Sequence, residues 1–157
     1  MTPPAIATRP ATDADDAFLF ALFKAVRAPD FAHLPLPPEQ LEHLMSLQFA
    51  GQKHSYTAQY PGGHSLILLD GAPIGRIWLH RGAREHQLVD ISLLPEYRNR
   101  GIGGALVAEA VAQARAAQVP LRCSVAVTNP GSLRFHQRLG FRIAARDEVY
   151  YDLAVEP

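Results

Sequence analysis

The sequence predicts a mixed α/β fold, in which a central, mostly antiparallel sheet of about seven strands carries helices on both faces. Short apolar runs of strand length alternate with stretches of helical periodicity. Asp70-Gly71 joins two of these runs directly, as in a two-residue hairpin. An apolar run ending near Leu94 leads into glycines and an alanine-rich helical stretch. Together these features indicate one layered domain with helices packed on a mixed sheet.

The first half of the chain is predicted to contain one strand and two helices. Residues 5–9 form the strand, and Thr12 is a good cap for a helix that reaches about residue 27. A second helix runs from 39 to about 52, and residues 53–61 fit no single pattern. Regular structure between the two helices is expected to be broken by Pro29, Pro35, Pro37 and Pro38.

The second half alternates strands and helices. Strands are expected at 65–70 and 72–80 around the hairpin, and Gly82-Ala83-Arg84 turns the chain into a strand at about 87–94. A helix at 101–118, a strand at 121–127, a helix at 131–139 and strands at 141–145 and 149–153 follow. The resulting order is βααβββαβαββ.

Composition limits the functional classes. A chain of 157 residues with 48% hydrophobic content suits one domain, residues 1–157. Fifteen basic and fifteen acidic residues cancel, so charge favours neither nucleic acid nor an anionic membrane as a partner. The apolar runs are too short to span a bilayer. Met1–Arg9 lacks the apolar core of a signal peptide, and the single cysteine, Cys123, excludes an internal disulfide framework. We therefore expect a cytoplasmic protein.

One segment is typical of an anion site. Arg98-x-x-Gly101-x-Gly103-Gly104 follows a strand and opens a helix. Glycines there let backbone N–H groups approach an anion, and the helix N-terminus adds partial positive charge. A nucleotide P-loop is excluded because Gly104 and Ala105 stand where Lys and Ser/Thr are needed. The dinucleotide fingerprint fails because its third glycine would be Leu106.

This strand, turn and helix resembles the GNAT acetyltransferase superfamily, where the motif holds the pyrophosphate of acetyl-CoA. A later segment resembles a second motif of that superfamily: Asn129 and Pro130 start a short helix, and Leu139-Gly140-Phe141 lead into a strand. Asn129 is also a good N-cap on physical grounds alone, and Gly140 a good helix terminator. The alternative is a glycine-rich turn that binds no ligand.

The resemblance implies acetyl-CoA as cosubstrate and no metal. The strand before the cradle is expected to splay from its neighbour, so that its backbone pairs with the pantetheine arm. An N–H near Leu93 or Leu94 would be the oxyanion donor. The expected acetyl-CoA-binding residues are Ile91, Leu93, Leu94, Arg98, Asn99, Arg100, Gly101, Ile102, Gly103, Gly104 and Asn129.

The resemblance also suggests catalytic groups. Many family members place a tyrosine as general acid in the short helix after Asn129, and His136 stands at that position here. A histidine can donate a proton, although a partly buried histidine is often structural. Tyr150 or Tyr151 could substitute.

Asp90, within a strand, is our candidate base, against the alternative of an ion-paired or exposed carboxylate. Glu85 and His86 are weaker candidates.

Other reactive residues have simpler explanations. Cys123 lies in an apolar strand and is predicted to be a small buried residue. Glu39 and His43, four apart, could share a metal, but no third ligand has a recognisable spacing and a solvated helix face explains them. Trp78 and Tyr97 are predicted to be packing residues.

The sequence thus predicts an N-acetyltransferase that moves an acetyl group from acetyl-CoA to a primary amine, on a small molecule or a peptide. Attack would be direct, in a ternary complex. A non-catalytic acyl-CoA-binding sensor is the alternative, and a plain interaction domain without affinity for CoA is the third hypothesis. The expected partners are acetyl-CoA and an unidentified amine. The family resemblance adds a homodimer as a candidate assembly, because family members are often dimers.

Overall fold

The computed structural model describes residues 5–157 and shows the element order expected from the sequence, with two added 3-10 turns. The strands are β1 (Ile6–Pro10), β2 (Ser65–Leu69), β3 (Ala72–Arg81), β4 (His86–Leu93), β5 (Leu121–Ala126), β6 (Arg142–Arg146) and β7 (Tyr150–Val155). The helical elements are η1 (Asp13–Asp15), α1 (Asp16–Phe31), α2 (Pro38–Gln59), η2 (Pro95–Tyr97), α3 (Ile102–Ala116) and α4 (Pro130–Arg138). Met1–Pro4, part of the segment used for the signal-peptide expectation, lie outside the described residues.

The strands follow the order β1-β2-β3-β4-β5-β7-β6 in a seven-stranded mixed sheet, which confirms the predicted fold class. Neighbouring strands are antiparallel in the β1–β2, β2–β3, β5–β7 and β6–β7 pairs, and β4 and β5 are parallel. The chain divides into two compact units. Unit 1 comprises residues 5–78 and 91–98, and unit 2 comprises residues 79–90 and 99–157.

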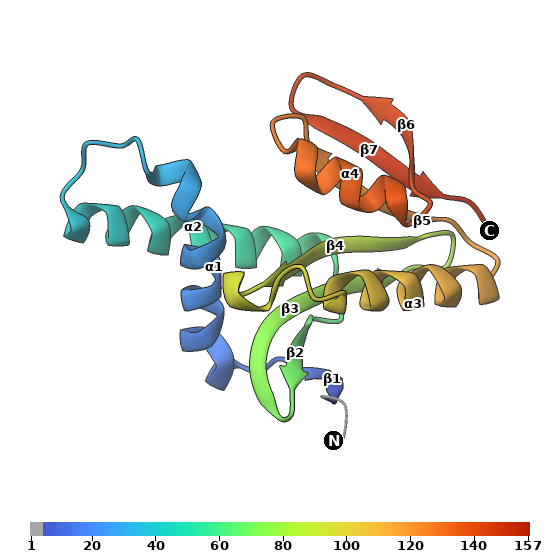
Figure 1. Ribbon diagram of the computed structural model, residues 1–157, viewed down its shortest axis with the longest axis horizontal. Helices are drawn as coiled ribbons and strands as arrows, with labels where there is room; N and C mark the ends of the chain where they lie inside the picture. Colours follow the sequence, from blue (N-terminus) through green and yellow to red (C-terminus); the bar gives the residue numbers. More distant parts are fainter. Residues whose placement is uncertain (1–4) are drawn as a thin grey trace. The chain divides into compact units, whose positions relative to one another are not determined.

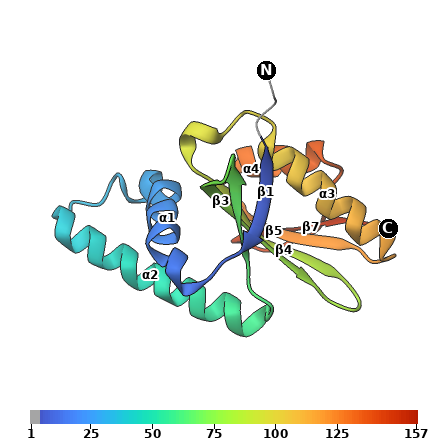
Figure 2. The same ribbon diagram turned by 90° about the horizontal axis from the view of Figure 1, so that it is seen from below.

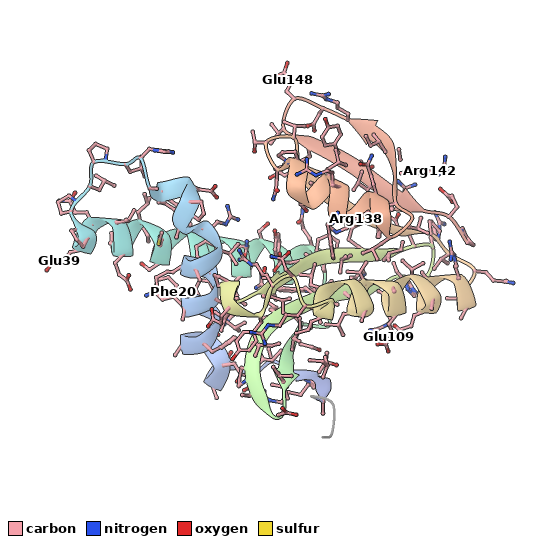
Figure 3. The ribbon with its side chains drawn as sticks, viewed as in Figure 1. Phe20, Glu39, Glu109, Arg138, Arg142 and Glu148 are labelled. Atoms are coloured by element: carbon pink, nitrogen blue, oxygen red, sulfur yellow. The ribbon has the colours of Figure 1, made fainter. Side chains whose placement is uncertain are left out.

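Unit 1 is built around the packing of α1 on α2, which lie side by side in Figures 1 and 2. Phe23 and Phe31 of α1 are buried against Met45 of α2. Figure 3 labels Phe20 on α1, whose ring lies 5.3 Å from that of Phe49 on α2. An ion pair between Lys53 and Asp16, 3.0 Å apart, joins the same two helices. Burial of apolar side chains therefore stabilises the packing of α1 on α2, because exposed ion pairs contribute little to the free energy of folding.

Two helix boundaries in unit 1 differ from the sequence prediction. Pro29 does not end α1, which continues through it to Phe31. Only two residues of the helix follow this proline, so few backbone hydrogen bonds are lost. Burial of Phe31 in the α1–α2 cluster favours the extra helical residues. The second helix reaches Gln59 instead of about Gln52. Its last turns are held by tertiary contacts, such as the edge-on contact of Tyr56 with Trp78.

The β2–β3 hairpin has the turn that the sequence predicts. Asp70 and Gly71 both have positive φ, 50° and 84°, as a type I′ turn requires. The register shifts between Ile67 and Leu68, where Ile67 faces Gly75 and Leu68 faces Pro73. This bulge alters β3 just before Gly75.

Unit 2 contains the three-stranded part β5-β7-β6 together with α3 and α4. Cys123 pairs with Leu153 across the strands, and both side chains are buried. The buried face of α3 is formed by Val107, Ala110, Val111 and Ala114. Figure 1 shows α4 beside β6 and β7, and Figure 3 labels Glu148 at the tip of the β6–β7 hairpin. Cys123 is buried, as the sequence predicts for a packing residue, and this burial raises the pKa of its thiol to about 12.

Within residues 5–157, no helix combines the length and the apolar character needed to cross a membrane. The same residues hold no group of three or more His, Cys, Asp or Glu side chains arranged to bind a metal ion.

Candidate acetyl-donor and catalytic site

The end of β4, in unit 1, contains three of the predicted acetyl-CoA-binding residues. Ile91, Leu93 and Leu94 are apolar side chains that the fold leaves half-buried. The N–H of Leu94 donates a hydrogen bond to the carbonyl oxygen of Ile74 on β3, at 2.9 Å. An N–H that already donates a hydrogen bond within the sheet is not available to donate to the developing oxyanion of the reaction. The candidate oxyanion donor predicted near Leu93 or Leu94 is therefore narrowed to Leu93.

Gly75 on β3 lies directly against this strand end. A Cβ built on Gly75 would overlap the carbonyl oxygen of Ser92 and lie 2.8 Å from Cδ2 of Leu93. Only glycine permits this approach of the two backbones. Gly75 was not among the site residues predicted from the sequence, although a lone glycine inside a strand pattern often marks a bulge or a close backbone approach.

Arg98 bonds back to the same strand end. Its Nε donates to the carbonyl oxygen of Leu93 at 3.1 Å, while the side chain stays exposed. The turn between them is closed by hydrogen bonds from the Tyr97 N–H to Leu94 and from the Arg98 N–H to Pro95. Arg98 thus fixes the Leu93 carbonyl in this structure, in addition to the phosphate contact predicted from the sequence.

The glycine motif in unit 2 has the backbone geometry of an anion cradle. Asn99 and Gly101 are left-handed, with φ of 60° and 80°, and α3 begins at Ile102. The first helical bond runs from the Ala105 N–H to the Gly101 carbonyl. The N–H groups of Ile102, Gly103 and Gly104 therefore lie in the first turn of a helix, where such groups have no intrahelical partner. They can bind an anion together with the positive end of the helix dipole.

β4 and β5 separate soon after they meet in unit 2. Their parallel register joins His86 with Leu121 and Gln87 with Arg122. Among the described residues of unit 2, β4 continues to Asp90 and β5 to Ala126 with no further register positions between them. This divergence agrees with the splayed strand that the family resemblance implied.

His136 on α4 is deeply buried, with 6% of its surface exposed. Its Nδ1 lies 2.8 Å from the carbonyl oxygen of Ser132, so Nδ1 carries the proton and Nε2 has the lone pair in the neutral ring. Phe135 and Phe141 contact the ring edge-to-face, at 5.0 and 5.3 Å between centroids. Burial lowers the pKa of His136, against an opposing contribution from the bond to Ser132.

α4 has the termini that the sequence predicts. The Oδ1 atom of Asn129 accepts a hydrogen bond from the Ser132 N–H at 3.1 Å, so Asn129 is the N-cap. Gly140 ends the segment with a φ of 98°. The side-chain amide N–H groups of Asn129 play no part in the cap, which leaves that exposed residue able to donate to a ligand.

The candidate bases lie on or near β4 in unit 2. Asp90 is half-buried, and the two-residue period of a strand places it on the face of His86 and Leu88. Glu85 forms an ion pair with Arg122, at 2.6 Å between Oε2 and Nε, so it is a paired carboxylate. Burial lowers the pKa of His86, with smaller contributions from Arg81 and His80.

The two tyrosines named as substitutes for His136 lie on β7. Tyr150 is about half exposed, at 51%, and pairs with Ala126 at the end of β5. Tyr151 is half-buried, and its hydroxyl accepts a hydrogen bond from Arg146 at 3.4 Å.

Comparison with known proteins agrees with this fold and motif geometry. The acetyltransferase (GNAT) family matches residues 28–141, most of the chain, and the chain belongs to this family. No curated protein sequence matches it.

Solved structures share the fold at low sequence identity. The PaiA N-acetyltransferase of Thermoplasma acidophilum, in complex with coenzyme A, has a TM-score of 0.74 at 19% identity, over 98% of this chain and 99% of that one. An acetyltransferase of Thermus thermophilus has a TM-score of 0.72 at 19% identity, over the whole of both chains. A GNAT acetyltransferase of Elizabethkingia anophelis with acetyl-CoA bound has a TM-score of 0.62 at 17% identity, over 97% and 98%.

Proposed function

We propose that the protein is an N-acetyltransferase that moves an acetyl group from acetyl-CoA to a primary amine on a small molecule or a peptide. The observation that carries the proposal is the left-handed backbone at Asn99 and Gly101, immediately before the first turn of α3. This arrangement directs several backbone N–H groups at one anion. Family membership and the donor ligands named for two structural neighbours support the same conclusion.

The residues present are suited to bind acetyl-CoA, the acetyl donor. Asn99 to Gly104 would hold the pyrophosphate through backbone N–H groups, and the exposed Arg100 would add charge. Ile91, Leu93 and Leu94 would lie along the pantetheine arm, since these side chains are half-buried at the end of the strand that precedes the cradle. The amide of Asn129 remains a candidate donor to the same arm.

The reaction requires one bond to form and one to break. The lone pair of the amine attacks the thioester carbonyl carbon, the C–S bond breaks, and CoA leaves as a thiolate that takes up a proton. The Leu93 N–H would stabilise the tetrahedral oxyanion. Asp90 would remove a proton from the amine, directly or through water, because it is half-buried on the strand that ends at Leu93.

The geometry restricts the role of His136. A neutral ring that donates from Nδ1 to Ser132 presents a lone pair at Nε2, which accepts a proton. Donation to the thiolate from Nε2 requires the imidazolium form, which burial disfavours. This observation favours the second candidate function, a non-catalytic acyl-CoA sensor, and it makes a turnover assay decisive.

The experiment is a thiol-release assay with acetyl-CoA and a panel of primary amines, including polyamines, amino acids and peptides with a free N-terminus. The enzyme function predicts amine-dependent release of CoA together with an acetylated product identified by mass spectrometry. Release that does not depend on the amine is thioester hydrolysis and argues against acetyl transfer. Binding of acetyl-CoA without turnover of any amine supports the sensor. The Asp90→Asn variant is expected to bind acetyl-CoA normally while its kcat falls by about 10²-fold or more.

A further inference from the structure

We propose that Gly75 is a positioning residue for acetyl transfer, because the space it leaves on β3 sets the direction of the Leu93 N–H. The inference rests on the proposed function and adds a residue that the sequence motifs do not contain. All the groups involved belong to unit 1, on β3, on the end of β4 and in the turn to Arg98.

The first step follows from the planarity of the peptide bond. The carbonyl of Ser92 and the N–H of Leu93 belong to one peptide unit, and the described chain has no cis peptide bonds. In a trans unit these two groups point in opposite directions. The Ser92 oxygen occupies the place where a side chain at residue 75 would begin. The contact with Gly75 therefore sets the plane of this unit and directs the Leu93 N–H away from β3.

A second observation gives the same direction. The Leu94 N–H donates to Ile74 on β3 at 2.9 Å. Successive N–H groups of an extended strand point to opposite edges, so the N–H of Leu93 is directed away from β3.

The next peptide unit is also fixed, at both of its ends. The Leu93 carbonyl accepts from Arg98 Nε at 3.1 Å, on the side opposite to the Leu94–Ile74 bond. Leu93 thus lies between two peptide planes that are each held by a named contact. Gly75 controls the plane that carries the candidate oxyanion donor.

The expected consequence of an added methyl group follows from its position. The φ of Gly75 is outside the left-handed region, so alanine can adopt this backbone and only the space is lacking. The overlapped atom belongs to the backbone and cannot swing aside as a side chain does. The Ser92–Leu93 plane must therefore rotate or shift. A displacement on the order of 1 Å at a catalytic group can cost about 10²-fold in rate.

The test compares Gly75→Ala with Gly51→Ala, a matched control on α2 where an added Cβ meets nothing within 4 Å. The readout is isotope-edited infrared spectroscopy of acetyl-CoA labelled with ¹³C at the thioester carbonyl. A hydrogen bond to that carbonyl lowers its stretching frequency, so the band reports the donor without any need for turnover. Affinity for CoA is measured in parallel by calorimetry.

We expect the wild-type protein and Gly51→Ala to lower the carbonyl frequency relative to free acetyl-CoA. Gly75→Ala should bind CoA within about threefold of wild type yet lose most of that shift. With an active amine, its kcat should fall about 10²-fold, with a much smaller change in the KM for acetyl-CoA. A purely structural role would not separate the carbonyl band from CoA affinity in this way.

The opposite outcomes are equally specific. An unchanged carbonyl shift in a folded Gly75→Ala overturns the positioning role and leaves the proposed function standing. A wild-type protein that binds no acetyl-CoA refutes the proposed function itself, and the positioning role with it.

If Gly75→Ala does not fold, replacement of the Leu93 amide by an ester tests the premise of the proposal, that the Leu93 N–H is the donor, since it deletes the N–H and keeps the side chain. Loss of the band shift in that variant supports the assignment, and retention overturns it.

Discussion

The Nδ1 atom of His136 lies 2.8 Å from the carbonyl oxygen of Ser132, one turn earlier on α4. A carbonyl oxygen only accepts, so this contact places the imidazole proton on Nδ1. The ring is enclosed by Phe135 and Phe141, and its burial favours the neutral form. His136, which we predicted as a general acid from the family resemblance, therefore has its Nδ1 proton engaged by the backbone, and burial lowers its pKa.

A substitution at His136 tests its part in catalysis. We expect His136→Phe to lower kcat by less than about tenfold, because a neutral imidazole with its proton on Nδ1 has none to give from Nε2. Removal of a working general acid costs about 10²–10⁴-fold. Tyr150→Phe, measured beside it, tests the half-exposed tyrosine at the start of β7, which pairs with Ala126 of β5. A 10²-fold loss in His136→Phe, with a rate that declines as a histidine loses its proton, would restore His136 as the acid.

The buried histidines predict how stability depends on pH. Burial lowers the pKa values of His86 and His136 below the ordinary 6.5 in the folded chain. Between the lowered and ordinary values the unfolded chain binds more protons, so folding stability rises with pH. Their contribution is present above pH 6.5 and is lost as the pH falls through the lowered pKa values. Urea unfolding at pH 7.5 and 5.5 should show a smaller pH difference for His136→Phe than for wild type. An equal difference would contradict this account.

The left-handed turn before α3 predicts a defect in ligand binding. Alanine at Gly101, where φ is 80°, costs about 1–2 kcal/mol of backbone strain and disturbs the cradle at its entrance. We expect Gly101→Ala to weaken CoA binding at least tenfold by calorimetry, with circular dichroism confirming that the protein remains folded. Gly51→Ala, in open space on α2, should bind as wild type does. Equal affinities in the two variants would exclude this turn as the cradle.

The buried pair in unit 2 predicts a stability difference between two leucines. Leu153 has no exposed surface and pairs with Cys123, whereas Leu47 on α2 is 58% exposed. Leu153→Ala should destabilise the protein by about 2–5 kcal/mol in urea unfolding. Leu47→Ala should change the free energy of unfolding by no more than about 0.5 kcal/mol. Similar losses from both would mean that the β5–β7 layer is not the core we describe.

Local chemistry made much of the fold predictable. The Asp70-Gly71 turn follows from the need for two positive φ values, and the α4 cap follows from the side chain of Asn129. The end of α2 was missed because its last turns depend on a contact with a distant part of the chain, the edge-on packing of Tyr56 against Trp78. The extension of α1 to Phe31 likewise depends on burial against Met45. Tertiary packing of this kind leaves no pattern in the local sequence.

The candidate site divides in the same way. The cradle at Asn99 and Gly101 was predictable, since its glycine spacing reports the backbone conformation that it needs. The tautomer of His136 and the engagement of the Leu94 N–H depend on atoms placed by the fold, so residue type alone could not reveal them. Gly75 falls between these cases, because a glycine inside a strand was visible but its partner, the Ser92 carbonyl, was not.

The measurement that tests the central claim most directly is the thermal unfolding of the protein with acetyl-CoA, with free CoA and ATP as comparisons. A ligand at a hundredfold its dissociation constant stabilises the folded state by about 2.7 kcal/mol. For a chain of this length that corresponds to a rise of about 5–10 °C in the midpoint. We predict such a rise with acetyl-CoA and with CoA, and none with ATP. No rise at millimolar acetyl-CoA would contradict the assignment of the Asn99–Gly104 segment as an acetyl-CoA cradle.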